Sequence, residues 1–235
     1  MAETDLQDRI DDFLRSAMKK YVIRDYESAI RDLKAAEMLD KNNPEILYNI
    51  GINYCRMGLD RSAIEYFKKV LNLKQSFIDA LVVKKLLAYA HIRLKQYEES
   101  LELLQQVLQL VPMDTAALNM KGYSLESVGL HNEALRVYSS IIENEKDNYN
   151  AYNSLGYILS KTGVNLVKAL QYAQIAYNSN NDNPAYLDTM GYVYLKMGNK
   201  DVARKYFIKA LEKAPLSAEI KDHIKECENN RTVRR

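Results

Sequence analysis

Residues 191–198 read GYVYLKMG, with two glycines seven positions apart. The same frame recurs as GINYCRMG at 51–58, GYSLESVG at 122–129 and GYILSKTG at 156–163. These four octets contain all eight glycines of the 235-residue chain. Glycines confined to one recurring frame indicate that the chain is built from a repeated structural unit.

A second series of small residues gives the length of the unit. Its members are separated by 34, 37, 34, 35 and 34 positions, and they are Ala29, Ala63, Ser100, Ala134, Ala169 and Ala203. Prolines fall at unit boundaries, and Pro44 and Pro184 each follow an asparagine. Asparagine is a good N-cap and proline suits the first helical position, so a helix is predicted to begin at each of these two sites.

The last unit shows which known pattern this is. It carries Leu187, Gly191, Tyr194, Ala203, Phe207 and Pro215. At these residues the chain resembles the tetratricopeptide repeat (TPR) family, whose 34-residue unit is a pair of helices, and the last two units resemble bacterial members. The resemblance implies an all-α fold, a right-handed superhelical α-solenoid of six TPR-like helix pairs with a C-terminal capping helix.

The predicted domain organisation follows the repeat frame. Residues 1–9 extend the first helix, six repeats fill 10–217, a capping helix occupies 218–229 and a flexible tail 230–235. The six repeats are 10–43, 44–77, 81–114, 115–148, 149–183 and 184–217. Residues 78–80 lie between repeats two and three and are expected to lengthen a helix there.

The glycines have two distinct predicted roles. The first of each octet lies mid-helix, where it lets the second helix of the pair approach closely despite its low helix propensity. The second ends that helix in the left-handed conformation. The frame departs from this rule twice, because repeat one has Arg24 at the second position and repeat three has no glycine.

The charge balance argues against several classes of function. The chain has 33 basic and 31 acidic side chains, a net charge of +2, and the two signs alternate along it. Nucleic-acid binding rests on massed basic residues, so no nucleic-acid partner is expected. There is no apolar stretch of the roughly 20 residues that span a bilayer, so no membrane insertion is expected. The expected location is cytoplasmic, or periplasmic or membrane-tethered if a signal segment has been removed.

Catalytic motifs were sought and none was found. The chain has no nucleotide loop, metalloprotease helix or nucleophile elbow. Its histidines, His91, His131 and His223, fall in separate units, and Cys55 and Cys227 have no metal-ligand spacing. A lone cysteine on a helix is most often a small buried apolar residue. The sequence therefore predicts a protein that is not an enzyme and uses no cofactor and no metal.

The TPR resemblance implies a concave groove lined by the first helix of each repeat. In repeats three to six, tyrosines recur at the ninth position with a basic residue often four places later, where helical side chains are neighbours. The predicted partner-binding residues are Tyr89, Arg93, Asn119, Tyr123, Asn153, Tyr157, Lys161, Tyr192 and Lys196. Tyrosines offer contact area at low entropy cost, the cations favour carboxylates, and a mid-helix asparagine bonds backbone groups.

The predicted function is a non-catalytic adaptor that binds an extended, somewhat acidic segment of a protein or peptide partner. Tyrosine and lysine also occur at these positions for packing and solvation alone. A structural scaffold or assembly subunit, for example of a bacterial envelope complex, is the alternative, and an accessory subunit of an enzyme is a third. Homo-oligomerisation stays open. Because repeat modules serve unrelated purposes, the fold by itself does not choose among these.

Overall fold

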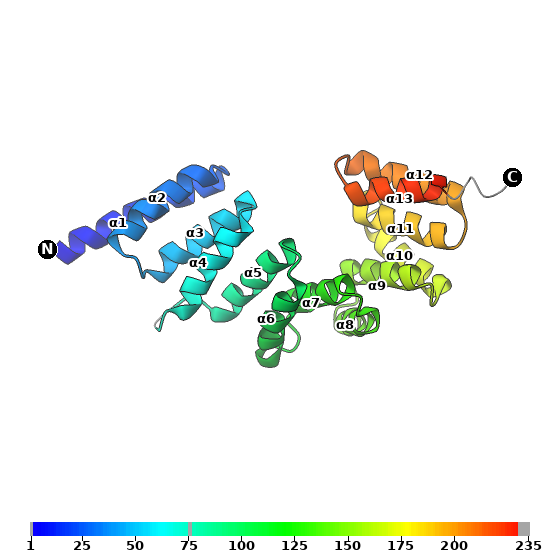
Figure 1. The fold of residues 1–235 in the computed structure, drawn as a ribbon, viewed down its shortest axis with the longest axis horizontal. Coiled ribbons are helices and arrows are strands. Elements are labelled where there is room, and N and C mark those ends of the chain that lie inside the picture. The colour runs from blue at the N-terminus through cyan, green and yellow to red at the C-terminus, as the bar shows by residue number, and fades with distance from the viewer. Residues whose placement is uncertain (1, 75–76, 230–235) are drawn as a thin grey trace. The chain divides into compact units, whose positions relative to one another are not determined.

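The computed structural model describes residues 2–74 and 77–229, and within them the chain is entirely α-helical, so the predicted all-α class is confirmed. The predicted flexible tail, 230–235, lies outside the described residues. The described residues form thirteen helices (Figure 1): α1 (Ala2–Val22), α2 (Tyr26–Leu39), α3 (Pro44–Met57), α4 (Asp60–Asn72), α5 (Ala80–Arg93), α6 (Tyr97–Leu110), α7 (Thr115–Ser127), α8 (His131–Asn144), α9 (Tyr149–Thr162), α10 (Leu166–Ser179), α11 (Pro184–Lys196), α12 (Lys200–Lys213) and α13 (Ala218–Asn229).

The chain forms two compact units, and the division between Ser124 and Leu125 falls within α7. In the first unit α1 packs on α2, α3 on α4 and α5 on α6, and successive pairs are joined by α2–α3 and α4–α5 contacts. In the second unit α9 packs on α10 and α11 on α12, and α13 packs on α12 and touches α11. Consecutive helices thus pair as in helical repeats.

Helix starts follow from the capping residues. The side chain of Asn43 accepts hydrogen bonds from the amides of Glu45 and Ile46, and Asn183 accepts one from Ala185, so both predicted N-caps are confirmed. The expectation that residues 78–80 lengthen a helix is wrong. The carboxylate of Asp79 accepts from the Leu81 amide at 2.8 Å, which makes Asp79 an N-cap and starts α5 at Ala80. An N-cap supplies a partner to a free first-turn amide.

The turn inside each helix pair has one recurring backbone conformation. Gly58, Gly129, Gly163 and Gly198 all have positive φ, as predicted for the second glycine of the octet. Arg24 and Lys95 stand at the same repeat position and also have positive φ, 63° and 58°. A left-handed conformation costs a non-glycine residue roughly 1–2 kcal/mol. The repeat geometry therefore imposes this turn even where the sequence lacks glycine.

The mid-helix glycines lie where two helices come into contact. A Cβ on Gly51 would stand 2.6 Å from the ring of Phe67, and one on Gly191 would stand 2.6 Å from the ring of Phe207. Both phenylalanines are fully buried. The phenylalanine ring therefore fills the space that a side chain on the facing glycine would need, which confirms the predicted close approach.

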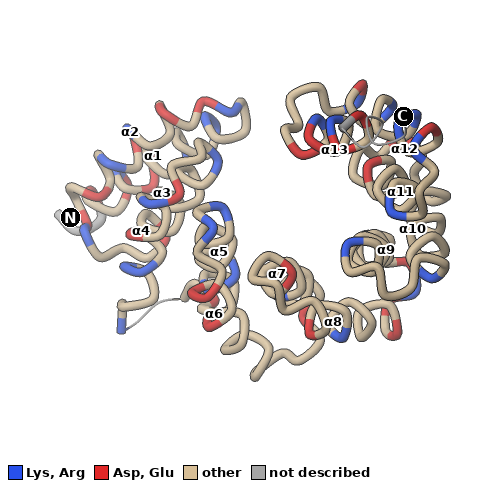
Figure 2. The backbone as a smooth tube through the Cα atoms, turned by 45° about the vertical axis from the view of Figure 1, so that its right-hand side comes forward, with Lys and Arg blue, Asp and Glu red and all other residues tan. Residues whose placement is uncertain are grey.

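Basic and acidic residues are distributed along the helices of both units, with the two signs interspersed (Figure 2). Several of them join neighbouring helices. In the first unit Lys85 contacts Asp114 at 2.6 Å, and in the second Lys213 contacts Asp182 at 2.9 Å. These two lysines are thus compensated by carboxylates of the same unit.

Candidate functional site

Four of the nine predicted binding residues line one cavity in the first unit. Tyr89 and Arg93 come from α5, and Asn119 and Tyr123 come from α7. The cavity has a volume of about 450 Å³, and its other lining residues are Ile92, Lys95, Tyr97 and Met120. We call it the Tyr89–Tyr123 pocket. The repeat spacing therefore predicted which side chains of the first helices of repeats three and four meet at one surface.

The two tyrosines from α5 and α7 in this pocket are about half exposed to solvent. Tyr89 is 45% exposed and Tyr123 is 48% exposed. The ring of Tyr97 packs edge-on against that of Tyr123, with centroids 6.2 Å apart. Between the tyrosines, the side-chain amide of Asn119 donates to the backbone carbonyl of Thr115 at 2.9 Å. Large, half-exposed aromatic side chains held in place by packing are well suited to contact a partner.

Arg93 has an internal carboxylate partner. Its Nε lies 3.1 Å from Oδ2 of the buried Asp60, and its Nη1 donates to the backbone carbonyl of Cys55 at 3.1 Å. The guanidinium also stands 5.9 Å from the centroid of the Tyr89 ring. Arg93 thus ties α5 to the turn between α3 and α4, while its exposed edge and Lys95 give the pocket its positive charge.

In the second unit the predicted tyrosines are packed together. The rings of Tyr157 and Tyr192 lie 5.2 Å apart, and the imidazole of His223 from α13 lies 4.7 Å from the Tyr192 ring. Tyr192 is only 7% exposed as a result. Burial, reinforced by the charge of Glu219, raises the pKa of Tyr157 well above its usual value. Most of the Tyr192 surface is therefore used inside the protein.

The two predicted lysines of this unit are also paired. Nζ of Lys161 donates to Oε1 of Glu126 at 2.5 Å, and Nζ of Lys196 donates to Oε1 of Glu226 at 2.8 Å. Asn153 is half-buried, and its Oδ1 has no hydrogen-bond partner among the residues that the structure describes. Each predicted cation of the candidate site thus lies beside a carboxylate of the chain itself.

A buried histidine–carboxylate pair in the second unit was missed by sequence reasoning. Nδ1 of His223 donates to Oδ1 of Asp188 at 2.9 Å, and both side chains are buried. Burial alone would lower the pKa of His223, but the hydrogen bond to Asp188 and the charges of Glu219 and Glu226 outweigh it and raise that pKa. The signal available in the sequence was periodicity, because His223 lies three residues after Ile220, which is itself buried, on the same face of the helix.

Both cysteines are free and buried, as expected for small apolar residues. Burial raises the pKa of Cys55 to about 11, and burial also raises the pKa of Cys227. A thiol with such a pKa is protonated near neutral pH, and only the thiolate is a good nucleophile. The two cysteines therefore serve packing.

Comparison with known proteins gives a consistent result. Sequence profiles described as tetratricopeptide repeat match residues 44–77 and 185–215, and a second such profile matches residues 85–144. Together they cover about half of the chain. A curated relative, TPR repeat-containing protein PA4667 of Pseudomonas aeruginosa, is 28% identical over 131 residues. Those residues are 56% of this chain and 22% of the relative, so the match spans less than a quarter of that protein.

Solved structures with the same fold include bacterial proteins. A tetratricopeptide repeat protein from Parabacteroides merdae superposes with a TM-score of 0.74 at 15% identity, over 94% of this chain and 84% of that one. PilW, described as a widely conserved type IV pilus biogenesis factor, gives a TM-score of 0.73 at 18% identity, over 91% of this chain and 97% of that one. Identities this low establish the fold and nothing further.

Across the described residues, 2–74 and 77–229, none of the helices combines the length and the apolar character needed to cross a bilayer.

Proposed function

The chain belongs to the tetratricopeptide repeat family, whose members are in general non-catalytic protein-interaction modules, and we propose that it acts as an adaptor that binds a partner segment at the Tyr89–Tyr123 pocket. The observation that carries the proposal is that four residues selected from repeat spacing line this one cavity. The partner is an extended segment, and it lies across the first helices of repeats three and four.

The chemistry of the pocket indicates the kind of segment that fits. Tyr89 and Tyr123 present ring surface for an apolar or proline side chain. The side-chain amide of Asn119, which donates to the Thr115 carbonyl, adds a polar group to the wall of the pocket. Lys95 is exposed at the edge of the pocket, next to the half-exposed Arg93. A segment with one apolar anchor and a nearby carboxylate matches these features.

The five remaining predicted residues, all in the second unit, have a different role in this proposal. Tyr157 and Tyr192 pack on each other, and the two lysines pair with internal carboxylates. Breaking such contacts to bind a partner would cost part of the stability of the unit. We therefore place the partner on the first unit.

A second candidate, a scaffold or assembly role, is favoured by another cavity of the first unit. It lies between α2 and α4, on second helices of repeats, has a volume of about 670 Å³ and includes the highly exposed Met38. Lys34, Lys41 and Lys69 line it, and Glu37 in the same wall pairs with Lys34 and Lys69. A broad partner surface with both apolar and charged groups fits such a face better than a single extended segment. The pilus biogenesis role in the name of PilW is an example of an assembly function for this fold.

Site-specific photo-crosslinking distinguishes the two candidates. A benzophenone amino acid replaces Tyr123 in one version of the protein and Met38 in another, and each is incubated with lysate of the source organism. We expect a discrete crosslinked partner, identified by mass spectrometry, from position 123. In a pull-down with protein that carries no photoreactive residue, the variant Tyr89→Ala/Tyr123→Ala should lose this partner at unchanged circular dichroism, since both side chains are half-exposed.

The matched control is Tyr149→Ala, which removes an exposed tyrosine of α9 in the second unit. It should retain the partner fully. If the partner crosslinks from position 38 alone and the Tyr89→Ala/Tyr123→Ala variant still captures it, the adaptor proposal is wrong and the scaffold role is supported.

A further inference from the structure

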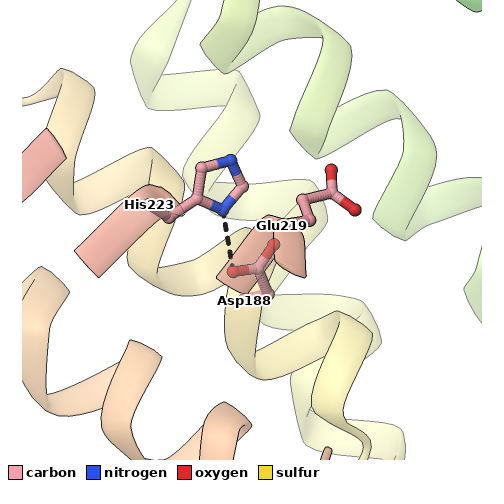
Figure 3. Close-up of side chains that lie close together, drawn as sticks. All are labelled: Asp188, Glu219 and His223. Carbon is pink, nitrogen blue, oxygen red and sulfur yellow. Dashed lines mark hydrogen bonds and ion pairs between the residues drawn. The ribbon is translucent and has the colours of Figure 1, made fainter. Parts of the chain in front are cut away.

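Three side chains that can ligate a metal ion converge where α13 meets α11. Asp188 comes from α11, and Glu219 and His223 come from α13 (Figure 3). One ligand atom from each residue lies within 4.8 Å of the other two. Glu219 and His223 are four residues apart on one helix, the spacing at which two helical side chains can share one ion.

We propose that Asp188, Glu219 and His223 form a binding site for one divalent transition-metal ion of the zinc type. One imidazole nitrogen and two carboxylate oxygens are a donor set that suits Zn²⁺, Co²⁺ or Ni²⁺, whereas Mg²⁺ and Ca²⁺ prefer oxygen ligands alone. Three protein ligands leave a fourth coordination position for water.

The observed geometry is close to what such an ion needs. At bond lengths of about 2.0–2.1 Å, two ligand atoms of a tetrahedral ion stand about 3.3 Å apart. Nδ1 of His223 and Oδ1 of Asp188 are 2.9 Å apart, so this pair has to open by only a few tenths of an ångström. Glu219 is exposed, and its side chain can rotate toward the pair without displacing the core. The ion would enter from that exposed side.

The surroundings hold the ligands in position. The rings of Tyr192 and Phe207 flank the imidazole, with centroids 4.7 Å and 5.4 Å from it, and limit its rotation. The hydroxyl of Tyr157 donates to Oε1 of Glu219 at 3.4 Å. Groups that orient metal ligands in this way raise affinity, and their loss typically costs 10–100-fold.

The charges around the site favour a cation. Two carboxylates face one imidazole, and the nearby Glu226 is already paired with Lys196. A divalent ion would neutralise both carboxylates and replace the Asp188–His223 hydrogen bond by three metal–ligand bonds that join α13 to α11. The consequence is a terminal helix whose attachment strengthens when the metal is bound, independent of any partner on the first unit.

Calorimetric titration of the full chain with ZnCl₂ tests the proposal. We expect one saturable site, and with CoCl₂ a visible absorption band typical of four-coordinate cobalt. Zn²⁺ should also raise the unfolding temperature. His223→Gln should weaken binding at least 100-fold, and Glu219→Gln at least 10-fold, with the thermal shift lost in parallel. Glu219→Gln alters an exposed side chain, so its fold should be unaffected.

The control is Asp222→Asn on the same helix, an exposed carboxylate whose side chain pairs with Lys225. It should bind Zn²⁺ like the wild-type protein. Absence of saturable binding to the wild type overturns the proposal. Binding that is equally strong in Glu219→Gln and His223→Gln also overturns it, because the ion would then be held elsewhere on the surface.

Discussion

Repeats three to six each carry a tyrosine at the same position of their first helix. The surroundings of these tyrosines differ between repeats three and four and repeats five and six. Tyr89 and Tyr123 line an open pocket, whereas Tyr157 and Tyr192 stack on each other. The difference arises at the end of the chain, where α13 places His223 on Tyr192 and Glu226 on Lys196. One repeat position thus holds half-exposed tyrosines in one unit and packed tyrosines in the other, depending on the next helix.

The largest expected effect is a loss of unfolding free energy on removal of the packed tyrosine of the second unit, compared with removal of a half-exposed tyrosine of the first. Tyr192→Ala deletes a buried ring that contacts two aromatic side chains, so it should destabilise the second unit by about 3 kcal/mol. Tyr123→Ala, at a half-exposed ring, should cost less than about 1 kcal/mol. Urea denaturation followed by circular dichroism measures both. Equal losses would mean that the two tyrosines are packed alike.

A smaller effect is expected at the mid-helix glycines of both units. Gly51→Ala and Gly191→Ala each bring a Cβ to 2.6 Å from a buried phenylalanine ring, which should cost about 1–3 kcal/mol. The better helix propensity of alanine recovers at most about 1 kcal/mol. Similar losses in thermal unfolding are expected for the two variants, because the facing rings are equally buried. A stabilised variant would contradict the close approach seen here.

The shared turn conformation predicts opposite changes in stability for two substitutions, one in each unit. Lys95 in the first unit has the left-handed conformation that glycines have in the second, so Lys95→Gly should stabilise the protein by about 1 kcal/mol. Gly163→Ala should destabilise it by a similar amount, and nothing lies within 4 Å of the added Cβ to obscure the backbone effect. Denaturant midpoints of the two variants should therefore move in opposite directions. Shifts in the same direction would refute the shared turn.

The smallest expected effect is a dependence of stability on pH. It concerns another shared repeat position, which is Lys85 in the first unit and Asp188 in the second. In the first unit Lys85 donates to the carboxylate of Asp114. Burial would raise the pKa of Asp114, but its hydrogen bonds from Lys85 and the Ala117 amide outweigh burial and lower the pKa below its usual value. This carboxylate therefore stabilises the fold above its unfolded-state pKa, and the stabilisation is lost as pH falls through the lower folded-state value.

Asp114→Asn should accordingly flatten the decline of unfolding free energy below about pH 4. Denaturant titrations at several acidic pH values measure that slope. Asp147→Asn, at an exposed carboxylate, is the control and should follow the wild type. An unchanged slope in Asp114→Asn would exclude this contribution.

Much of the fold was predictable because it rests on local chemistry. Asn43 and Asn183 act as N-caps, and the octet glycines take left-handed turns or face a partner helix, as their positions in the repeat predict. Prediction from local sequence failed at two places. Lys95 takes a turn that lysine disfavours, because the helices on both sides require it. Asp79 begins a helix in an insertion for which the repeat frame has no position.

The candidate site was predictable only in part. The TPR resemblance, carried along the chain by the repeat spacing, placed Tyr89, Arg93, Asn119 and Tyr123 on one face, because residues at equal repeat positions of neighbouring helices lie together. Spacing did not indicate that Arg93 pairs with Asp60, nor that α13 buries Tyr192. Those contacts depend on rotamers and on which side chains the next helix presents.

The amino-acid sequence by itself determined the repeat length, the helix pairs, the turns and the apolar faces, since these follow from propensity, capping and periodicity within about 34 residues. Tertiary structure decided which of the equivalent positions stay open to a partner and which are covered. It also brought Asp188, Glu219 and His223 together from two helices. Such convergence depends on how α13 packs on α11 and on the rotamers of the three side chains, which no local pattern records.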